Sequence, residues 1–329
     1  MSYCAAGIGS YWRPHEKEAV DKYFGNEQPN LEADYFIWRH NTECVSVGHY
    51  NQSVNIENDF LSTGNNKIIN PMSSYKYTNN KDSCFEVWEK ENVSSPKFFT
   101  YENRGEFEEK RIDFPFLLRL NDGVTGEDTY LIESEEDLEE DYPKVDMAYA
   151  SKQRIDTKKI CVQFIDTTIA SGYKTSFRLA VAGDSVISGY ARISDDWLAI
   201  TKQFTEDKKQ SFVEQNKRVQ NLIKDNHDEI VKCVQSLGLH HVGVDMIADS
   251  NDKIYFLEVQ PFYFCGNTSR TKAPFWNPYK PQELVDWLVN DKKELYKDMS
   301  MYYDKWLDKK NHFDDCYSSL RRYFDVRSK

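Results

Sequence analysis

Runs of alternating and continuous hydrophobic residues predict a chain rich in short strands. Two hairpins stand out: residues 177–193 turn at Gly183 and Asp184, and residues 243–262 turn within 249–252. The second turn consists of Asp, Ser and Asn residues, which tolerate tight backbone geometry. Further strands are predicted by the apolar segments 34–40, 67–71, 97–101, 114–120, 129–132 and 159–166.

Apolar residues at helical spacing predict the helices. Residues 205–237 are expected to be helical, with Gly238 at the C-terminal end of this segment. A shorter helix is expected to start near Asn80 or Asp82. Ser134, followed by acidic residues, is suited to open another helix as its N-cap.

The hairpin at 243–262 carries oxygen-donor side chains on both of its arms. Glu258 and Gln260 are two residues apart, so they point to the same side of their strand. If the arms pair as their lengths suggest, Asp245 comes beside them. Two carboxylates and an amide are hard oxygen ligands of the kind that Mg²⁺ prefers. The alternative is a surface hairpin with ordinary polar residues.

The hairpin at 177–193 carries one arginine on each arm, Arg178 and Arg192. Arg178 shares a strand face with Ala180 and Ala182, opposite the larger apolar residues. Guanidinium groups on such a face suit a polyphosphate, which they bind through two parallel hydrogen bonds. The alternative is a pair of exposed arginines on a sheet surface.

Two more features point weakly to phosphate, and a third is a charge that needs a partner or a use. Lys81 lies at a predicted helix start, where backbone N–H groups favour an anion. Arg119 is a charge within an apolar strand, which is costly unless the charge is paired or used. The loop 121–128 contains Gly123 and Gly126 and brings backbone N–H groups within reach of phosphates. It matches neither a Walker A loop nor a dinucleotide fingerprint.

Composition excludes several classes of protein. The formal net charge of −12 argues against a groove that follows nucleic-acid phosphates. Seven scattered cysteines without a C-x-x-C pair argue against a disulfide scaffold or a zinc site, and favour a reducing compartment. The N-terminus lacks a secretion signal, and no apolar stretch is long enough to span a membrane. We therefore expect a cytoplasmic protein without nucleic-acid or membrane partners.

From about Lys81 to Pro261, the order of these motifs resembles the ATP-grasp superfamily. The similarity is to the carboxylate–amine and peptide ligase branch, of the D-alanine–D-alanine ligase and ribosomal-protein S6 glutamate ligase types. It implies an α+β fold in which two α/β subdomains clasp ATP. The implied domains are a small N-terminal α/β domain (1–78), a lid subdomain (79–166), a core with the metal site (167–280) and C-terminal helices (281–329).

The resemblance also implies roles for single residues. Arg119 stands where the family has a lysine, and Gln260 stands where it has an asparagine. Arg270, which follows the metal ligands, is our hypothesis for binding the substrate carboxylate. The implied ATP-binding residues are Lys81, Arg119, Gly123, Val124, Thr125, Gly126, Gln163, Phe164, Ile165 and Asp166; the catalytic residues are Arg178, Arg192 and Arg270; the Mg²⁺ ligands are Asp245, Glu258 and Gln260.

The activity that the resemblance implies is carboxylate–amine ligation dependent on ATP and Mg²⁺. An amino acid, peptide or protein carboxylate would become an acyl phosphate, and an amine would then displace the phosphate. Two alternatives stay open: a kinase of the same fold that phosphorylates a hydroxyl, and a non-catalytic ATP-binding scaffold. A homodimer formed through the aromatic C-terminal helices is a further expectation.

Overall fold

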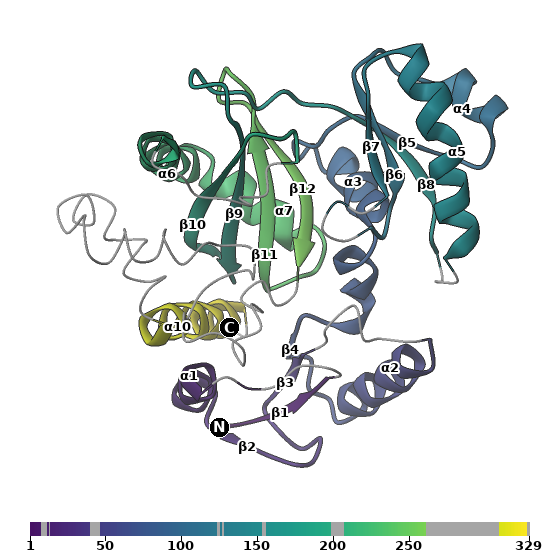
Figure 1. Cartoon of the computed structure of the whole chain (residues 1–329). Helices are drawn as coiled ribbons and strands as arrows, with labels where there is room; N and C mark the ends of the chain where they lie inside the picture. Colours follow the sequence, from purple (N-terminus) through teal and green to yellow (C-terminus); the bar gives the residue numbers. More distant parts are fainter. Residues whose placement is uncertain are drawn as a thin grey trace.

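The structure is a computed structural model that describes residues 1–7, 12, 14–39, 47–123, 126, 128–152, 156–198, 207–260 and 309–327. Within these residues the chain forms three four-stranded sheets with helices packed on them (Figure 1). The predicted α+β class is therefore confirmed.

The first sheet is parallel and has the order β2-β1-β3-β4. The strands predicted at 34–40 and 67–71 are present as β3 and β4. Large aromatic residues fill the space between this sheet and its helices, among them Tyr3, Phe24 and Phe60. The elements are β1 (Ser2–Ala6), α1 (Pro14–Phe24), β2 (Asn26–Glu27), β3 (Tyr35–Trp38), α2 (Val47–Ser62) and β4 (Ile68–Ile69).

The second sheet is antiparallel and has the order β5-β8-β6-β7. Helices α4 and α5 cover one face of it, and Ser134 caps α5 as predicted, accepting the Asp137 N–H at 3.2 Å. The elements are the 3₁₀ helix η2 (Met72–Thr78), α3 (Lys81–Lys90), β5 (Phe98–Tyr101), α4 (Arg104–Lys110), β6 (Phe116–Leu120), β7 (Thr129–Ile132), α5 (Glu135–Ser151) and β8 (Lys159–Gln163).

The third sheet contains both predicted hairpins, in the order β10-β9-β11-β12. Helices α6 and α7 pack on the face that carries Phe177, Leu179 and Val244. Residues between these positions, including Arg178 and Asp245, point to the opposite face. The elements are β9 (Lys174–Ala182), β10 (Ser185–Ser194), α6 (Lys208–Asp225), α7 (His227–Gln235), β11 (His241–Ala248) and β12 (Ile254–Gln260).

The helical segment predicted at 205–237 is present as two consecutive helices, α6 and α7. Asn226 separates α6 from α7. Its backbone N–H and its side-chain Nδ2 both donate to the Leu222 carbonyl, at 3.0 and 2.9 Å. An asparagine that bonds back to the preceding turn in this way offers the backbone an alternative to further helix.

A one-residue bulge interrupts β12. Asp245 pairs with Glu258, but the next residue, Met246, pairs with Phe256, so Leu257 is extra. Phe256 and Val259 both belong to the core although they are three residues apart. The bulge therefore turns Glu258 to the face that Asp245 occupies.

Helix α10 (Lys309–Arg327) is the described part of the predicted C-terminal helices. It lies between α1 and the third sheet (Figure 1). It packs on Ala180 and Ala182, and Ser319 Oγ donates to the Ala182 carbonyl at 2.8 Å. This helix thus covers one end of the sheet face that carries Arg178. Among the described helices, none has the length and apolar character needed to cross a bilayer.

Asn70, just after β4, joins the first sheet to the third. Its Oδ1 accepts the N–H groups of His240 and His241 at 2.9 and 3.0 Å, and its Nδ2 donates to the His241 carbonyl at 2.8 Å. The Asn70 N–H donates to His240 Nδ1 at 3.2 Å. The His240 ring also contacts Phe324 of α10. His240 therefore lies where three parts of the chain meet.

This junction predicts a pH-dependent stability. Burial, and secondarily the charge of Arg327, lowers the pKa of His240 to about 4. Below the ordinary pKa of histidine, the unfolded chain takes up a proton that the folded chain does not. The free energy of unfolding should therefore fall by about 2 kcal/mol between pH 8 and pH 5 from this residue. Urea unfolding at both pH values measures it.

The control for this prediction compares two histidine variants. His240→Asn retains an acceptor but does not titrate, so it should show a smaller loss between pH 8 and pH 5 than the unmodified chain. His15→Gln changes a half-exposed histidine and should keep the full loss. An equal pH dependence in His240→Asn and the unmodified chain would contradict the assignment.

Candidate functional site

A row of charged side chains crosses the third sheet on the face away from α6 and α7. In the strand register, Arg178 lies opposite Asp245, and Asp245 lies opposite Glu258. Tyr190 lies opposite Arg178 on the other side. Directly opposed residues are close enough for their side chains to interact. The prediction that Asp245 comes beside Glu258 is confirmed.

Asp245 accepts hydrogen bonds from both predicted arginines. Arg178 donates from Nε to Oδ1 at 2.6 Å and from Nη2 to Oδ2 at 2.5 Å, while Arg192 Nη2 donates to Oδ1 at 2.6 Å. Burial opposes the charge of Arg178, but Asp245 outweighs it and raises the pKa of the guanidinium. Arg192 Nε is buried and has no acceptor among the described residues.

Glu258 is held by residues from two different parts of the fold. Its Oε2 lies 2.7 Å from Lys81 Nζ, at the start of α3, and its Oε1 accepts Gln260 Nε2 at 2.8 Å. Burial favours the neutral acid, but the charges of Lys81, Arg178 and Arg119 together outweigh it and hold the pKa of Glu258 well below its ordinary value. Burial also lowers the pKa of Lys81, against the opposing effect of Glu258.

Lys81 and Arg119 meet at the beginning of the glycine loop. Lys81 Nζ donates to the Gly123 carbonyl at 2.8 Å, and Arg119 Nη2 donates to the same oxygen at 3.2 Å. Burial lowers the pKa of Arg119. The Gly123 N–H donates to the Leu120 carbonyl at 3.4 Å. At Gly123 the loop therefore presents its carbonyl, rather than its N–H group, to the two cations.

The other residues of this loop are described only in part. Gly126 has a φ of +80°, and a Cβ atom there would lie 2.7 Å from the Leu198 side chain. The positive φ favours glycine at this position, whereas the Leu198 side chain is flexible and could move away from a Cβ atom. Val124 and Thr125 lie outside the described residues.

The second sheet carries an apolar row beside Arg119. Arg119 lies opposite Ile160, and Leu117 lies opposite Val162, with Phe98 beyond Val162 in the same row. These side chains point away from α4 and α5, whose core contains the residues between them. Ile160 and Val162 are buried in the core that α3 also lines, whereas Leu117 and Phe98 are partly exposed at its edge.

The segment 163–166 follows β8 at the end of this apolar row. The N–H groups of Gln163 and Phe164 donate to the carbonyls of Lys97 and Pro115, whereas Ile165 N–H has no acceptor in the described parts of the chain. Asp166 is exposed, and its Oδ1 accepts the Thr168 N–H and Lys174 Nζ, both at 3.0 Å. Hydrogen bonding to Thr168, opposed in part by burial, lowers the pKa of Asp166.

The structure thus brings half of the sixteen predicted residues into two neighbouring groups of direct contacts. Arg270 lies outside the described residues. Sequence reasoning missed Lys174, although extending the alternation of Arg178 backwards along β9 would have put it on the same face. It also missed the buried polar residues Asp82 and Asn121. One group of direct contacts joins Arg178, Arg192 and Asp245, and the other joins Lys81, Arg119, Gly123, Glu258 and Gln260; the strand pair Asp245 and Glu258 sets them side by side.

The chemistry of Asp245, Glu258 and Gln260 fits a hard divalent cation. Two carboxylates face each other across neighbouring strands, and the Gln260 amide lies beside them. Among the described residues, no group of three or more histidine, cysteine, aspartate or glutamate side chains forms a metal cluster. A cation at Asp245 would have to share its oxygens with the two arginines, unless an anion engages the guanidinium groups.

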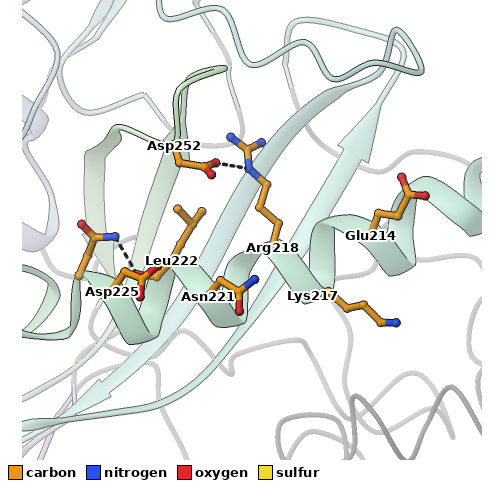
Figure 2. A pocket seen from close by; sticks show the side chains of 8 residues that line it. Glu214, Lys217, Arg218, Asn221, Leu222, Asp225 and Asp252 are labelled. Atoms are coloured by element: carbon orange, nitrogen blue, oxygen red, sulfur yellow. Dashed lines mark hydrogen bonds and ion pairs between the residues drawn. The ribbon is translucent and has the colours of Figure 1, made fainter.

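A separate depression lies on the other side of the third sheet, along α6 (Figure 2). Its volume is about 480 Å³. Arg218 in its wall donates to Asp252 at 2.7 Å and to the Asp249 carbonyl at 2.6 Å. Because α6 packs against the core face, this depression is distinct from the charged row. Its lining residues are Glu214, Lys217, Arg218, Asn221, Leu222, Asp225, Asn226 and Asp252.

Comparison with known proteins identifies the family and the fold of the chain. A family model described as a RimK-like ATP-grasp domain matches residues 78–263, more than half of the chain. A search of curated protein sequences found no match. Among solved structures, the chain is similar to an L-amino acid ligase from Bacillus licheniformis, with 12% identity and a TM-score of 0.50 over 83% of this chain and 71% of that one.

A second solved structure gives a similar result. It is the N5-carboxyaminoimidazole synthetase from Staphylococcus aureus in complex with ADP, with 12% identity and a TM-score of 0.50 over 79% of this chain and 70% of that one. At this identity, both similarities concern the fold. The predicted ATP-grasp fold is confirmed.

Proposed function

The chain belongs to the RimK-like ATP-grasp family and is an ATP-dependent ligase, and on this premise we propose that it joins a carboxylate to an amine through an acyl phosphate. The observation that carries this proposal is the network in which Lys81, Arg178 and Arg192 surround Asp245 and Glu258. Buried cations next to buried carboxylates suit the transfer of a phosphoryl group to a carboxylate.

The arginines would stabilise the phosphoryl group during its transfer. Protein catalysis of this step consists mainly of positioning and of fixed positive charge near the developing negative charge. Arg192 Nε, which has no acceptor within the described residues, has the capacity to bind an oxygen of that group. Lys81 and Arg119, which share the Gly123 carbonyl, would neutralise the remaining phosphates.

The proposed reaction has two steps, and in each step one bond forms while another breaks. A carboxylate oxygen of the substrate attacks the terminal phosphorus of ATP, and the bond to ADP breaks. The amine then attacks the acyl carbon, phosphate leaves, and the amine nitrogen loses a proton. Asp245, Glu258 and Gln260 would hold Mg²⁺, which when bound would offset the negative charge of the phosphates.

The rest of the nucleotide would lie along the second sheet. Leu117, which is partly exposed, offers apolar contact for the adenine, and the Ile165 N–H is suited to bind its edge. Asp166 Oδ2, which has no partner among the described residues, is suited to a ribose hydroxyl. We also retain Val124 and Thr125 as loop residues over the phosphates, and Arg270 for the substrate carboxylate.

This placement of the nucleotide defines the boundaries of the domains that we propose. Residues 79–166 would form the lid subdomain and 167–280 the core, with the nucleotide between the second and third sheets. Residues 1–78 would form the N-terminal domain, and 281–329 the C-terminal helices. The carboxylate and amine would come from an amino acid, peptide or protein.

The deciding experiment measures ADP release over mixtures of amino acids and peptides, with Mg²⁺ present. The expected result is ADP release that depends on the amine, with free phosphate formed in equal amount. Glu258→Gln, which removes a carboxylate of the network, serves as the inactive control. A stable phosphorylated product would instead identify a kinase. Binding of ATP without any turnover would identify a scaffold.

A further inference from the structure

Two polar residues without solvent exposure lie beneath the proposed phosphate site. Asp82, in the first turn of α3, and Asn121, directly after β6, are both 0% exposed. Asp82 Oδ1 accepts Asn121 Nδ2 at 2.8 Å, and Asp82 Oδ2 accepts Lys158 Nζ at 2.8 Å. The contacts join the start of α3 to the end of β6 and to the segment before β8.

Every polar group of Asn121 takes part in a hydrogen bond. Its backbone N–H donates to the Lys158 carbonyl at 3.0 Å, and its Oδ1 accepts the Lys158 N–H at 2.9 Å. Its Nδ2 also donates to the Asp156 carbonyl at 2.9 Å. Finally, its own carbonyl accepts the Lys81 N–H at 3.1 Å. One asparagine therefore fixes the backbone of Lys81 relative to two strands.

The segment 119–123 thus binds both the backbone and the side chain of Lys81. Asn121 binds the backbone N–H of Lys81, and Gly123 accepts the side-chain amine. From this position the amine also reaches Glu258, which belongs to the third sheet. A shift in the first turn of α3 would change both contacts of the amine together.

Burial of the Asp82 carboxylate is an expensive way to gain stability alone. Removing an aspartate from water costs several kcal/mol, and the Lys158 amine that pairs with it stays about half-exposed. Buried, fully bonded polar groups do fix one geometry, because an alternative arrangement leaves them without partners. The hydrogen bond to Asp82, opposed in part by burial, raises the pKa of Lys158.

We propose that Asp82, Asn121 and Lys158 form a positioning cluster that holds Lys81 in place for the phosphates of ATP. The cluster acts through Lys81 and does not itself touch the nucleotide. This inference rests on the proposed function, because it assigns Lys81 to the phosphates. It adds three residues to the site that neither the motif pattern nor the family match assigns.

The test measures the dissociation constant of an ATP analogue with an imido bridge between its β and γ phosphorus atoms. Asn121→Ala should weaken binding about tenfold or more, as loss of an orienting partner commonly does. In a chain that already carries Lys81→Ala, the same substitution should change the constant less than about twofold. Such non-additivity indicates that two residues act as one unit. Equal effects in both backgrounds would overturn the proposal.

Asn70→Ala is a matched control. Asn70 is also a buried asparagine whose side chain makes three hydrogen bonds, but these lie at the junction with His240 and His241. It should lower thermal stability and leave the dissociation constant unchanged. If it weakens analogue binding as much as Asn121→Ala does, a general loss of stability explains the result and the proposal is wrong.

Lys158→Ala provides a second variant with less risk to the fold, because the Lys158 side chain is 47% exposed. It should weaken analogue binding about three- to tenfold, since Asp82 keeps only its bond from Asn121. No change in this variant would also overturn the proposal. If the unmodified chain does not bind the analogue, the proposed function fails first, so the two failures can be distinguished.

Discussion

Replacing Arg178 with alanine is expected to lower kcat for ADP release by about 10³-fold. Arg178 makes two hydrogen bonds to Asp245 in the middle of the charged row, and both groups are largely buried. The substitution removes positive charge where the phosphoryl group would be transferred. It also leaves Asp245 with Arg192 as its remaining cationic contact among the described residues. Steady-state ADP release measures the change.

Two variants show whether the lower kcat of Arg178→Ala comes from the lost contact geometry or from the lost charge alone. Arg178→Lys keeps the charge but loses the two-pronged contact, so its kcat should lie between those of the alanine variant and the unmodified chain. Arg218→Ala removes an arginine that pairs with Asp252 on the opposite side of the sheet and should leave kcat unchanged. A kcat for Arg178→Ala within about threefold of the unmodified chain would remove Arg178 from the mechanism.

An ATP analogue is expected to strengthen the binding of a divalent cation by about 100-fold. Both oxygens of Asp245 accept from guanidinium groups, and Glu258 accepts from Lys81 and Gln260. A cation alone therefore competes with these donors. Phosphates that engage the arginines and Lys81 would release the carboxylates to the metal. By linkage, the metal must strengthen analogue binding by the same factor.

Mn²⁺ is a suitable probe, because its free concentration can be followed by its paramagnetic resonance with and without the imido-bridged analogue. Arg192→Gln should bind Mn²⁺ more tightly than the unmodified chain when no analogue is present, since one competitor for Asp245 is gone. The strengthening by the analogue should be smaller in this variant. Independent binding of Mn²⁺ and the analogue would show that these carboxylates do not exchange partners in this way.

Strand patterns predicted the parts of the site that depend on local sequence. Alternation placed Arg178 on the open face of β9, and the two-residue spacing placed Glu258 and Gln260 together. The short turn at 249–252 brought the two arms together as expected, which led to the prediction that Asp245 lies beside Glu258. The exact pairing also needs the bulge, because the register that leaves the turn would put Asp245 opposite Leu257. Alternation within one strand needs only the period of a strand, whereas the bulge could not be read from it.

Contacts between distant elements could not be predicted in this way. No local pattern indicates that Lys81 reaches Glu258, because the two residues come from a helix and a strand 177 positions apart. The sequence pattern assigns Asn121 only to a glycine loop, because packing, and not local sequence, brings its partners Asp82 and Lys158 to it. The break at Asn226 was missed because the apolar spacing continues across it, while a side-chain hydrogen bond decides where the helix ends.

The extra residue in β12 has a consequence for the comparison of related sequences. A relative that lacks one residue at Leu257 would pair regularly, and its glutamate would directly follow Phe256 on the opposite face, still beside Asp245. A gap at this point of an alignment is therefore compatible with the carboxylate pair. A relative of the same length that forms no bulge would instead turn its glutamate into the core with Phe256. Identity of residue types is then an insufficient criterion for this end of the site, because the bulge decides which face the glutamate occupies.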